Sequence, residues 1–353
     1  MLHFTSEPKS ICILRLSAIG DICHTLPVVR TIQANWPNTK ITWIIGKIEY
    51  ELIKGIPDID FIIFDKKNGF SEYLNIRKQV HDIKFDVLLH MQMSLRASLV
   101  SLMIKSKIKI GFDRQRAKDG QWLFTNTKIN HVPRQHVIDS LFGFSEAVGI
   151  TEHKFIWDIP IPDDARQSAK TLVGSHSKYV VISPCSSKDY RNWNIQGYAA
   201  IADYIKEKYH YDVILTGGNS KIEKKYGKEI IRGCKHPPLN LIGQTNLKEL
   251  LAIIEGAQCM ISPDSGPAHM STAMATPVIG LYATTNPDRA RPYLSTNWLV
   301  NRYPDAIYKK YHKEVKDVPW GTRVRDDWAM RLITVNDVMN MIDTFLQQTP
   351  KKI

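Results

Sequence analysis

The stretch Ile11-Cys-Ile-Leu-Arg-Leu-Ser-Ala-Ile-Gly-Asp21 joins a short apolar run to a loop of small residues that leads into a helical pattern. Residues 11–16 are short and rich in Ile and Leu, which is typical of a strand buried in a parallel sheet. Ligands bind beyond the carboxyl ends of such strands, so the loop that ends at Asp21 lies where a functional site is expected. A strand, a loop and a helix in this order predict an α/β fold with parallel sheets.

The same alternation of Ile/Val-rich runs and amphipathic stretches continues outward along the chain. In the first half we expect four further strands, at residues 41–45, 61–64, 87–90 and 109–112. In the second half we expect five strands, at residues 179–183, 213–216, 240–241, 259–261 and 277–282. Two α/β units therefore follow one another.

The segment Ile159-Pro-Ile-Pro-Asp-Asp164 separates the two halves. It suits neither a helix nor a central strand, because proline lacks the backbone N–H that both use. We expect one domain at residues 1–160, a second at 161–334, and a C-terminal helix and tail at 335–353. A chain of 353 residues is long enough for two such domains.

The composition excludes several classes of protein. Hydrophobic residues make up 43% and charged residues 23%, as in ordinary globular proteins. The five cysteines are scattered without a CxxC pair, which indicates neither a disulfide framework nor a metal site. The most apolar stretch, residues 87–104, contains charged and polar residues and predicts no membrane-spanning helix. The first ten residues lack the apolar segment of a secretion signal, so we expect a cytoplasmic protein.

The formal net charge of +12 predicts a partner that carries negative charge. Charge alone does not choose among nucleic acid, acidic lipid and phosphorylated small molecules. Nucleic acid binding favours aromatic residues interleaved with basic ones, and the basic cluster of the first half offers little beyond Trp122 and Phe124, so we expect no nucleic acid partner. A pocket for a carboxylated or phosphorylated acceptor is a better explanation of the basic residues in the first half than nucleic acid binding. These residues are Arg96, Arg114, Arg116, Lys118, Arg134 and His136.

Asp21 admits two interpretations. It lies just before a helix, where an aspartate commonly does no more than cap the first turn. It also follows a strand end, where a carboxylate can serve a ligand. The loop has no GxGxxG pattern, so a dinucleotide-binding site is weakly supported.

The stretch Ile261-Ser-Pro-Asp-Ser-Gly-Pro-Ala-His-Met270 again joins a strand, a tight loop and a helix. Ser265 or Gly266 can cap this helix, and the small side chains leave backbone N–H groups open to an anion. His269, one turn inside the helix, is by default a core or capping histidine. Asp264 beside these small residues makes the pattern more specific than a bare cap.

Two other loops follow strands of the second half. Ser183-Pro-Cys-Ser-Ser-Lys-Asp-Tyr-Arg-Asn-Trp193 holds two adjacent hydroxyls, a lysine and Arg191, a composition suited to a diphosphate or to an ordinary surface loop. Thr216-Gly-Gly-Asn-Ser-Lys-Ile-Glu223 is a glycine turn followed by an acid. The acid could accept hydrogen bonds from ribose, although a simple turn is the better explanation of the glycines alone.

The combination Ser17-Ala-Ile-Gly-Asp-Ile-Cys-His-Thr-Leu-Pro27 with Asp264-Ser-Gly-Pro-Ala-His269 resembles glycosyltransferase family 9, the bacterial lipopolysaccharide heptosyltransferases. The resemblance runs over nearly the whole chain. By Leu14-Arg-Leu-Ser-Ala-Ile-Gly-Asp21 and Ile41-Thr-Trp-Ile-Ile-Gly46, the chain is most similar to heptosyltransferases I, which add the first inner-core heptose.

This resemblance implies a GT-B fold, in which two facing Rossmann-like domains bind the acceptor (first domain) and the nucleotide-sugar donor (second domain). It implies ADP-L-glycero-D-manno-heptose as donor and a Kdo residue of Kdo-lipid A as acceptor. It further implies inversion at the anomeric carbon without a metal or other cofactor, and a location at the cytoplasmic face of the inner membrane.

The resemblance also implies roles for individual residues. Asp21 matches an aspartate proposed as the general base, and Arg191 matches a basic residue that holds the donor phosphates. Glu223 would be the ribose acid, but its surroundings contain extra residues relative to the usual pattern. The remaining matches to the donor site are Ser186, Ser187, Asp264, Ser265, Gly266 and His269.

The residue types agree with this chemistry. A hydroxyl attacks an oxocarbenium-like carbon while ADP leaves, so one side needs a carboxylate and the other fixed positive charge. Two other functions compete: a nucleotide-sugar epimerase of the same architecture, and a module that binds anionic surfaces. The epimerase would need additional acid and base groups, and only the net charge supports the binding module.

Overall fold

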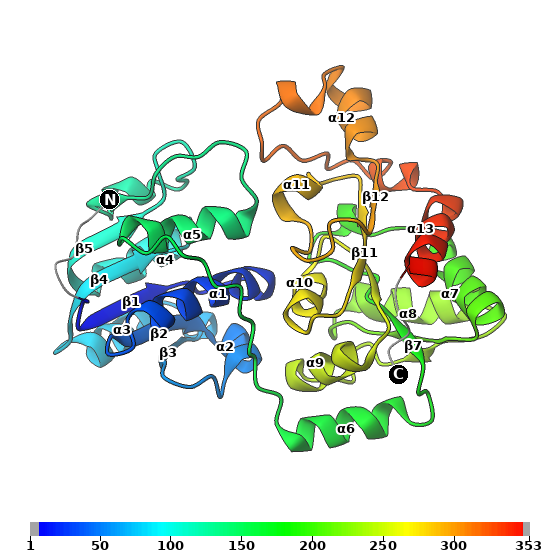
Figure 1. Ribbon diagram of the computed structural model, residues 1–353, viewed down its shortest axis with the longest axis horizontal. Helices are drawn as coiled ribbons and strands as arrows, with labels where there is room; N and C mark the ends of the chain where they lie inside the picture. The colour runs from blue at the N-terminus through cyan, green and yellow to red at the C-terminus, as the bar shows by residue number, and fades with distance from the viewer. Residues whose placement is uncertain (1–6, 349–353) are drawn as a thin grey trace. The chain divides into compact units, whose positions relative to one another are not determined.

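The computed structural model describes residues 7–348, and its contacts divide the chain into two compact units (Figure 1). Unit 1 ends at Pro160 and unit 2 begins at Ile161. Each unit is built on one six-stranded parallel sheet, which confirms the predicted fold class. Among the helices of residues 7–348, none is both long and apolar enough to cross a membrane.

The sheet of unit 1 has the strand order β3-β2-β1-β4-β5-β6. β1 lies at its centre and pairs with both β2 and β4, with Ile13 opposite Trp43 and Leu89. These central positions are fully buried, because apolar residues on both faces pack under helices. The strands are β1 (Ser10–Leu14), β2 (Lys40–Gly46), β3 (Asp60–Phe64), β4 (Lys84–His90), β5 (Lys105–Gly111) and β6 (Thr127–Lys128).

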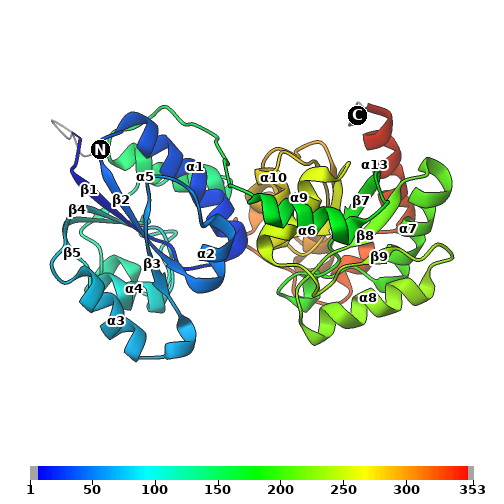
Figure 2. The same ribbon diagram turned by 90° about the horizontal axis from the view of Figure 1, so that it is seen from below.

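Helices cover both faces of this sheet, as Figure 2 shows, with α1 and α5 on one face and α3 and α4 on the other. The core under α3 and α4 includes Ile76 and Val100, which pack against Leu88 of β4. The helices of unit 1 are α1 (Ile19–Asn35), α2 (Lys47–Ile53), α3 (Ser71–Val80), α4 (Leu95–Leu102) and α5 (Val137–Ala147).

The sheet of unit 2 has the strand order β12-β11-β10-β7-β8-β9. Counted from the first strand of each unit, both sheets share one order, the order of Rossmann folds. The strands are β7 (Tyr179–Ile182), β8 (Asp212–Leu215), β9 (Leu239–Asn240), β10 (Met260–Pro263), β11 (Val278–Tyr282) and β12 (Leu299–Asn301).

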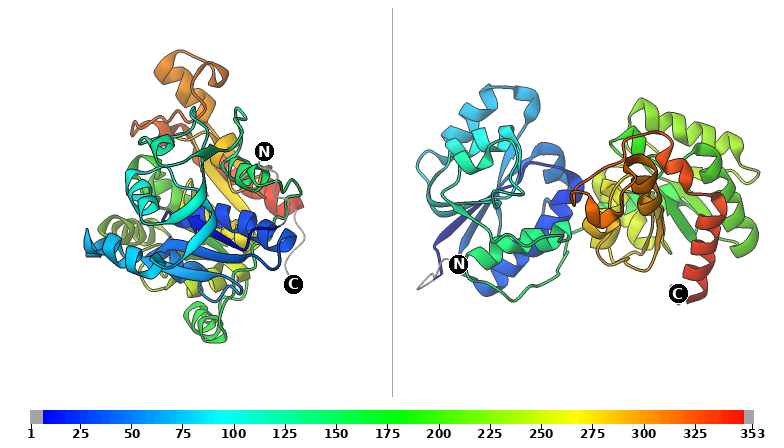
Figure 3. Two further views of the ribbon diagram at one scale, coloured as in Figure 1. Left: turned by 90° about the vertical axis from the view of Figure 1, so that its left-hand side faces the viewer. Right: turned by 90° about the horizontal axis from the view of Figure 1, so that it is seen from above.

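The helices of unit 2 also lie on both faces of their sheet, and the last helix, red in Figure 3, packs beside α7. Its Asp343 accepts hydrogen bonds from Tyr204, Tyr209 and Lys208, and its Phe345 is buried in the core of unit 2. The helices are α6 (Asp163–Val173), α7 (Ile195–Tyr209), α8 (Lys221–Gly233), α9 (Leu247–Gly256), α10 (Gly266–Ala273), α11 (Pro287–Ala290), α12 (Tyr303–Tyr311) and α13 (Val335–Gln348).

The strands differ from the predicted ones mainly at the edges of the sheets. All ten predicted strands overlap strands of the structure, but β6 and β12 were not predicted. These edge strands have two and three residues, too few to show an apolar period. β5 begins four residues earlier than predicted, at Lys105, because alternate lysines interrupt its apolar run.

The chain changes direction across each sheet at one point, between β1 and β4 in unit 1 and between β10 and β7 in unit 2. Ligands of open α/β sheets bind in the crevice outside the carboxyl ends of the strands at such a switch point. A functional site is therefore expected in the loops after these four strands.

Candidate functional site

Asp21 lies in the first turn of α1, as the third residue of the helix, and not before it as the sequence predicted. The loop was expected to continue to Asp21, whereas Gly20 is already buried and helical and Ala18 occupies the N-cap position. The Oδ2 atom of Asp21 accepts a hydrogen bond from the backbone N–H of Ala18, at 3.1 Å. Asp21 therefore does contribute to the cap of α1.

Asp21 also forms an ion pair with Arg15, whose Nη2 atom lies 2.6 Å from Oδ2. The Arg15 side chain is 9% exposed and the Asp21 side chain 37%. Both contacts of the carboxylate use Oδ2, so Oδ1 has no protein hydrogen-bond partner among residues 7–348. Because the side chain is partly exposed and its Oδ1 atom has no protein partner among these residues, the carboxylate can accept a proton from a ligand.

Residues after β4 hold this loop in place. Gln92 accepts hydrogen bonds through Oε1 from the backbone N–H groups of Leu16 (2.6 Å) and Ser17 (3.1 Å). Arg15 donates from Nη1 to the carbonyl oxygen of Met91. The carboxyl ends of β1 and β4 are thus tied together at the switch point of unit 1.

The corresponding place in unit 2 holds a cluster that we call the unit 2 anion site: Ser186, Arg191, Asp264, Ser265, Gly266 and His269. The Nη1 atom of Arg191 forms an ion pair with the carboxylate of Asp264 (3.1 Å) and donates a hydrogen bond to the carbonyl oxygen of the same residue (3.2 Å). The hydroxyl of Ser186 donates to the same carbonyl oxygen, at 2.8 Å. The structure therefore brings together two predicted loops that lie more than 70 residues apart in the sequence.

Asp264 is buried and ionised in this cluster. Burial alone would raise the pKa of its carboxyl, but His269, whose Nε2 lies 3.9 Å away, and the charge of Arg191 outweigh burial and hold this pKa below its ordinary value. The Nε atom of Arg191 is buried and has no hydrogen-bond partner among residues 7–348. A buried guanidinium N–H without a partner is a donor that a ligand can satisfy.

The N-terminus of α10 adds backbone donors to the unit 2 anion site. Ser265 is the N-cap residue, as predicted, but its hydroxyl bonds to the hydroxyl of Ser262 (2.8 Å) and does not cap the helix. The first N–H groups of α10, from Gly266 onward, therefore receive no side-chain cap from Ser265. Such a helix end favours a phosphate group.

Two other residues that were predicted to bind the donor, Ser187 and Glu223, are not part of the unit 2 anion site as defined above. Ser187 is exposed next to Ser186, and within residues 7–348 it forms no hydrogen bond with Arg191 or Asp264. Glu223 forms a capping box at the start of α8, where Oε1 accepts from the N–H of Gly218 (2.6 Å) and Oε2 contacts the hydroxyl of Ser220 (2.5 Å). The structure gives Glu223 the role of holding a glycine turn, and its role toward ribose stays a prediction.

The predicted acceptor residues of unit 1 do not form one group. Arg96 on α4 is exposed, as are Arg114, Lys118 and Arg134 in loops. His136 is different, because it is buried and serves as the N-cap of α5, accepting from the N–H of Ile138 at 3.2 Å. Its side chain is used within the fold.

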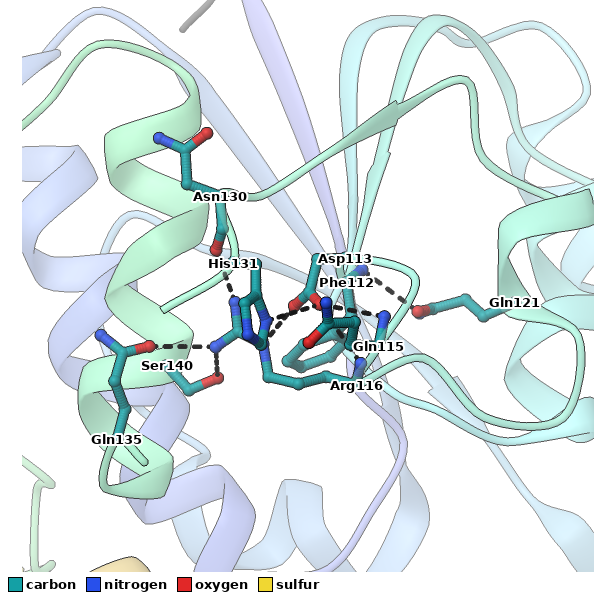
Figure 4. A network of polar contacts seen from close by, with 9 residues as sticks. All are labelled: Phe112, Asp113, Gln115, Arg116, Gln121, Asn130, His131, Gln135 and Ser140. Carbon is teal, nitrogen blue, oxygen red and sulfur yellow. Dashed lines mark hydrogen bonds and ion pairs between the residues drawn. The ribbon is translucent and has the colours of Figure 1, made fainter. Parts of the chain in front are cut away.

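Arg116 is also used within the fold, as Figure 4 shows. Its guanidinium pairs with the buried carboxylate of Asp113 and donates to the carbonyl oxygen of Asn130 at 2.6 Å. It further donates to Gln135 (3.0 Å) and Ser140 (2.6 Å). This network ties the loop after β5 to the start of α5.

The network predicts a stability effect. Burial would raise the pKa of Asp113, but the hydrogen bond and charge of Arg116 outweigh it and lower that pKa. Arg116→Lys keeps a charge but loses the planar fork, so it should cost about 1 kcal/mol in urea unfolding at neutral pH. The matched variant Arg114→Lys, at an exposed position, should stay within about 0.5 kcal/mol.

The cost should shrink as pH falls. Asp113 has a lowered folded pKa, so its stabilising contribution is present above its unfolded pKa, near 4, and is lost as pH falls through the folded value. Equal unfolding free energies for Arg116→Lys and the wild type at pH 7 would show that the network does not stabilise the fold.

Sequence reasoning did not single out Arg15, Gln92 or Glu49. Arg15 and Gln92 are polar residues just past strand ends, and this position is the signal that could have indicated them. Glu49, in the first turn of α2, lies near Asp21; burial, and to a smaller degree the charge of Asp21, raises the pKa of its carboxyl above the ordinary value.

Residues 73–317 match the family model described as glycosyltransferase family 9 (heptosyltransferase). The chain belongs to glycosyltransferase family 9. The lipopolysaccharide core heptosyltransferase OpsX of Haemophilus influenzae is 42% identical to it over 339 residues, which cover 96% of this chain and 97% of OpsX. The protein is therefore a glycosyltransferase of the heptosyltransferase family, and this membership does not favour an epimerase.

Two solved structures share the fold of this family 9 chain. A glycosyl transferase family 9 protein from Veillonella parvula is 20% identical with a TM-score of 0.80, covering 97% of this chain and 98% of its own. The E. coli heptosyltransferase WaaC with ADP is 17% identical with a TM-score of 0.70, covering 95% and 99%. These similarities confirm the GT-B fold that the resemblance predicted.

Proposed function

We propose that the protein transfers L-glycero-D-manno-heptose from ADP-heptose to a Kdo residue of Kdo-lipid A, as the first heptose of the lipopolysaccharide inner core. The observation that carries this proposal is the unit 2 anion site, at the switch point of a family 9 glycosyltransferase. The buried Nε atom of Arg191 and the open helix end have the chemistry that a departing diphosphate needs.

The donor would be held by its diphosphate. The unpartnered Nε of Arg191 and the first N–H groups of α10 supply donors of positive character. Asp264 orients Arg191 through the ion pair at 3.1 Å and thereby limits the rotamers of its side chain. The solved WaaC structures hold ADP or ADP-2-deoxy-2-fluoro heptose, which supports an ADP-sugar donor for this chain.

The proton of the attacking hydroxyl would go to Asp21. In the proposed step, an acceptor oxygen forms a bond to the anomeric carbon, and the bond from that carbon to the diphosphate oxygen breaks with its electron pair. The carboxylate accepts the hydroxyl proton through Oδ1, while Arg15 and Ala18 fix Oδ2. Attack on the face opposite the leaving group inverts the anomeric configuration.

The acceptor carries negative charge on its Kdo carboxylate. We infer that exposed cations of unit 1, Arg96, Arg114, Lys118 and Arg134, meet that charge. Arg116 and His136 would act indirectly, because both hold the start of α5 in place. The assignment of the acceptor to unit 1 and the donor to unit 2 is part of the proposal.

A two-substrate incubation tests the proposed function. Purified protein with ADP-heptose and Kdo-lipid A should release ADP at a rate that depends on both substrates. Omitting the acceptor, or replacing the donor with UDP-glucose, should reduce ADP or UDP release to the background rate. Equal release with and without acceptor would contradict transfer and indicate a hydrolase.

We predict that activity survives a strong chelator. The guanidinium of Arg191 and the helix end of α10 provide the positive charge that a divalent cation gives to other diphosphate enzymes. Turnover in EDTA should equal turnover in added magnesium within about twofold. A loss of turnover in EDTA that magnesium or manganese restores would contradict the metal-free mechanism.

A further inference from the structure

Helix α4 of unit 1 presents a row of leucines on the side away from its sheet. Leu95, Leu99 and Leu102 recur at intervals of four and three residues, which places them on one face of the helix. The three leucines are 55%, 38% and 55% exposed, respectively, whereas Ala97 and Val100 are buried in the core. The outer face of a helix on a soluble domain is normally polar, so this apolar row indicates an interaction surface.

The 3-10 helix η2 (Gln121–Leu123) lies near the N-terminal end of α4. Gln121 donates from Nε2 to the carbonyl oxygen of Gln92, at 3.3 Å. Gln92 donates in turn to the hydroxyl of Ser94, the N-cap of α4, at 3.1 Å. The other two residues of η2 are 42% and 77% exposed, Trp122 and Leu123. We define the α4–η2 surface as Leu95, Leu99, Leu102, Trp122 and Leu123.

Basic side chains lie beside this surface. Lys105, Lys107 and Lys109 alternate along β5 and so point to one face of the sheet. Lys109 donates from Nζ to the carbonyl oxygen of Ser101 on α4, at 2.9 Å, so this is the face that α4 covers. Lys105 and Lys107 are exposed. Near η2, the guanidinium of Arg114 lies 5.6 Å from the centre of the Trp122 ring.

The charge of unit 1 is concentrated in the same segment. Residues 95–123 contain seven basic and two acidic residues, whereas the rest of residues 1–160 contains fourteen of each. One of the two acids, Asp113, is buried and paired with Arg116. The whole positive excess of unit 1 therefore belongs to the segment that carries the exposed leucines.

We propose that the α4–η2 surface docks on a lipid bilayer that carries anionic headgroups. The leucines and Trp122 enter the boundary between headgroups and acyl chains, where an aromatic ring with one polar edge is favoured. The surrounding lysines and arginines meet the lipid phosphates. The biological role of this docking rests on the proposed function, because the acceptor proposed there is anchored by acyl chains.

Vesicle co-sedimentation tests the docking without any sugar substrate. Wild-type protein should bind vesicles of 70% phosphatidylethanolamine and 30% phosphatidylglycerol, and should bind phosphatidylcholine vesicles far more weakly. The variant Leu95→Gln/Leu102→Gln keeps a good helix former at both positions and removes apolar contact. The lipid concentration for half-maximal binding should rise at least about tenfold.

The matched control removes equally exposed apolar groups from unit 2. Leu294 and Tyr308 are 55% and 64% exposed, so Leu294→Gln/Tyr308→Gln should bind vesicles like the wild type. Equal vesicle binding by the wild type and Leu95→Gln/Leu102→Gln, with unchanged circular dichroism and melting temperature, would overturn the proposal. A wild-type dimer that this variant converts to a monomer would also overturn it, and would assign the surface to a second copy of the chain.

Two acceptors separate a failure of docking from a failure of the proposed function. Leu95→Gln/Leu102→Gln should use a deacylated, water-soluble Kdo acceptor at the wild-type rate and Kdo-lipid A in vesicles at least about fivefold more slowly at limiting lipid. Vesicle binding without transfer to either acceptor would support docking and contradict the proposed function. Equal rates on both acceptors for variant and wild type would contradict docking while leaving the function in place.

Discussion

Replacing Asp21 with asparagine should lower turnover by about 10²- to 10⁴-fold, the range of general base catalysis. The amide keeps an oxygen that can accept from Arg15 and Ala18, so α1 and its loop should keep their places. It no longer offers a carboxylate to take the proton of the acceptor hydroxyl. ADP-heptose affinity should stay near the wild-type value, because the unit 2 anion site is unchanged.

The cap of α1 is the competing explanation, and a matched variant controls for it. Glu249 is the corresponding third residue of α9, where its Oε2 accepts from the N–H of the N-cap Asn246 at 2.8 Å. Glu249→Gln should cost a similar small amount of stability and leave turnover intact. Near-wild-type turnover of Asp21→Asn, measured with donor affinity and melting temperature, would reduce Asp21 to a helix cap.

Replacing Arg191 with alanine should weaken donor use by about ten- to a hundredfold. Charge-assisted hydrogen bonds to a phosphate contribute roughly 1.5 to 3 kcal/mol, and Arg191 offers a buried N–H that has no partner among the described residues. The effect should appear in the dissociation constant of ADP, measured calorimetrically, and in the KM for ADP-heptose. The KM for the acceptor should change little.

Two further variants serve as controls for Arg191→Ala. Arg166, on the surface of unit 2, pairs with Glu255, and both side chains are more than 40% exposed. Arg166→Ala should leave ADP binding within about twofold, as expected for a surface ion pair. Arg191→Lys restores a charge beside Asp264 and should recover part of the affinity. Wild-type donor affinity in a folded Arg191→Ala protein would remove Arg191 from the donor site.

The sequence was sufficient for the general fold because the deciding signals are local. Most of the predicted strands are short apolar runs followed by a turn, so they could be predicted from neighbouring residues alone. β6 could not, because Thr127 and Lys128 form no apolar run and are held by pairing with β5. β12 has only three residues at a sheet edge and is held by pairing with β11.

The arrangement of the site was harder to predict because its partners are remote in sequence. Arg191 and its partner Asp264 are separated by 73 residues in the sequence, and Gln92 and its partner Leu16 by 76. Only the strand order brings these residues together. The role of Arg116 inside unit 1 was hidden for the same reason, since Asn130 and Ser140 lie 14 and 24 residues away from it. His136 has a local role instead, as the N-cap of α5.

The most direct test of the central claim is the structure of the product. After incubation with ADP-heptose and a Kdo acceptor, the product should be analysed by mass spectrometry and by NMR of the new anomeric centre. We expect an acceptor that carries one additional heptose on Kdo, with the anomeric configuration opposite to that of the donor. A product with retained configuration, or ADP release with an unmodified acceptor, would contradict it.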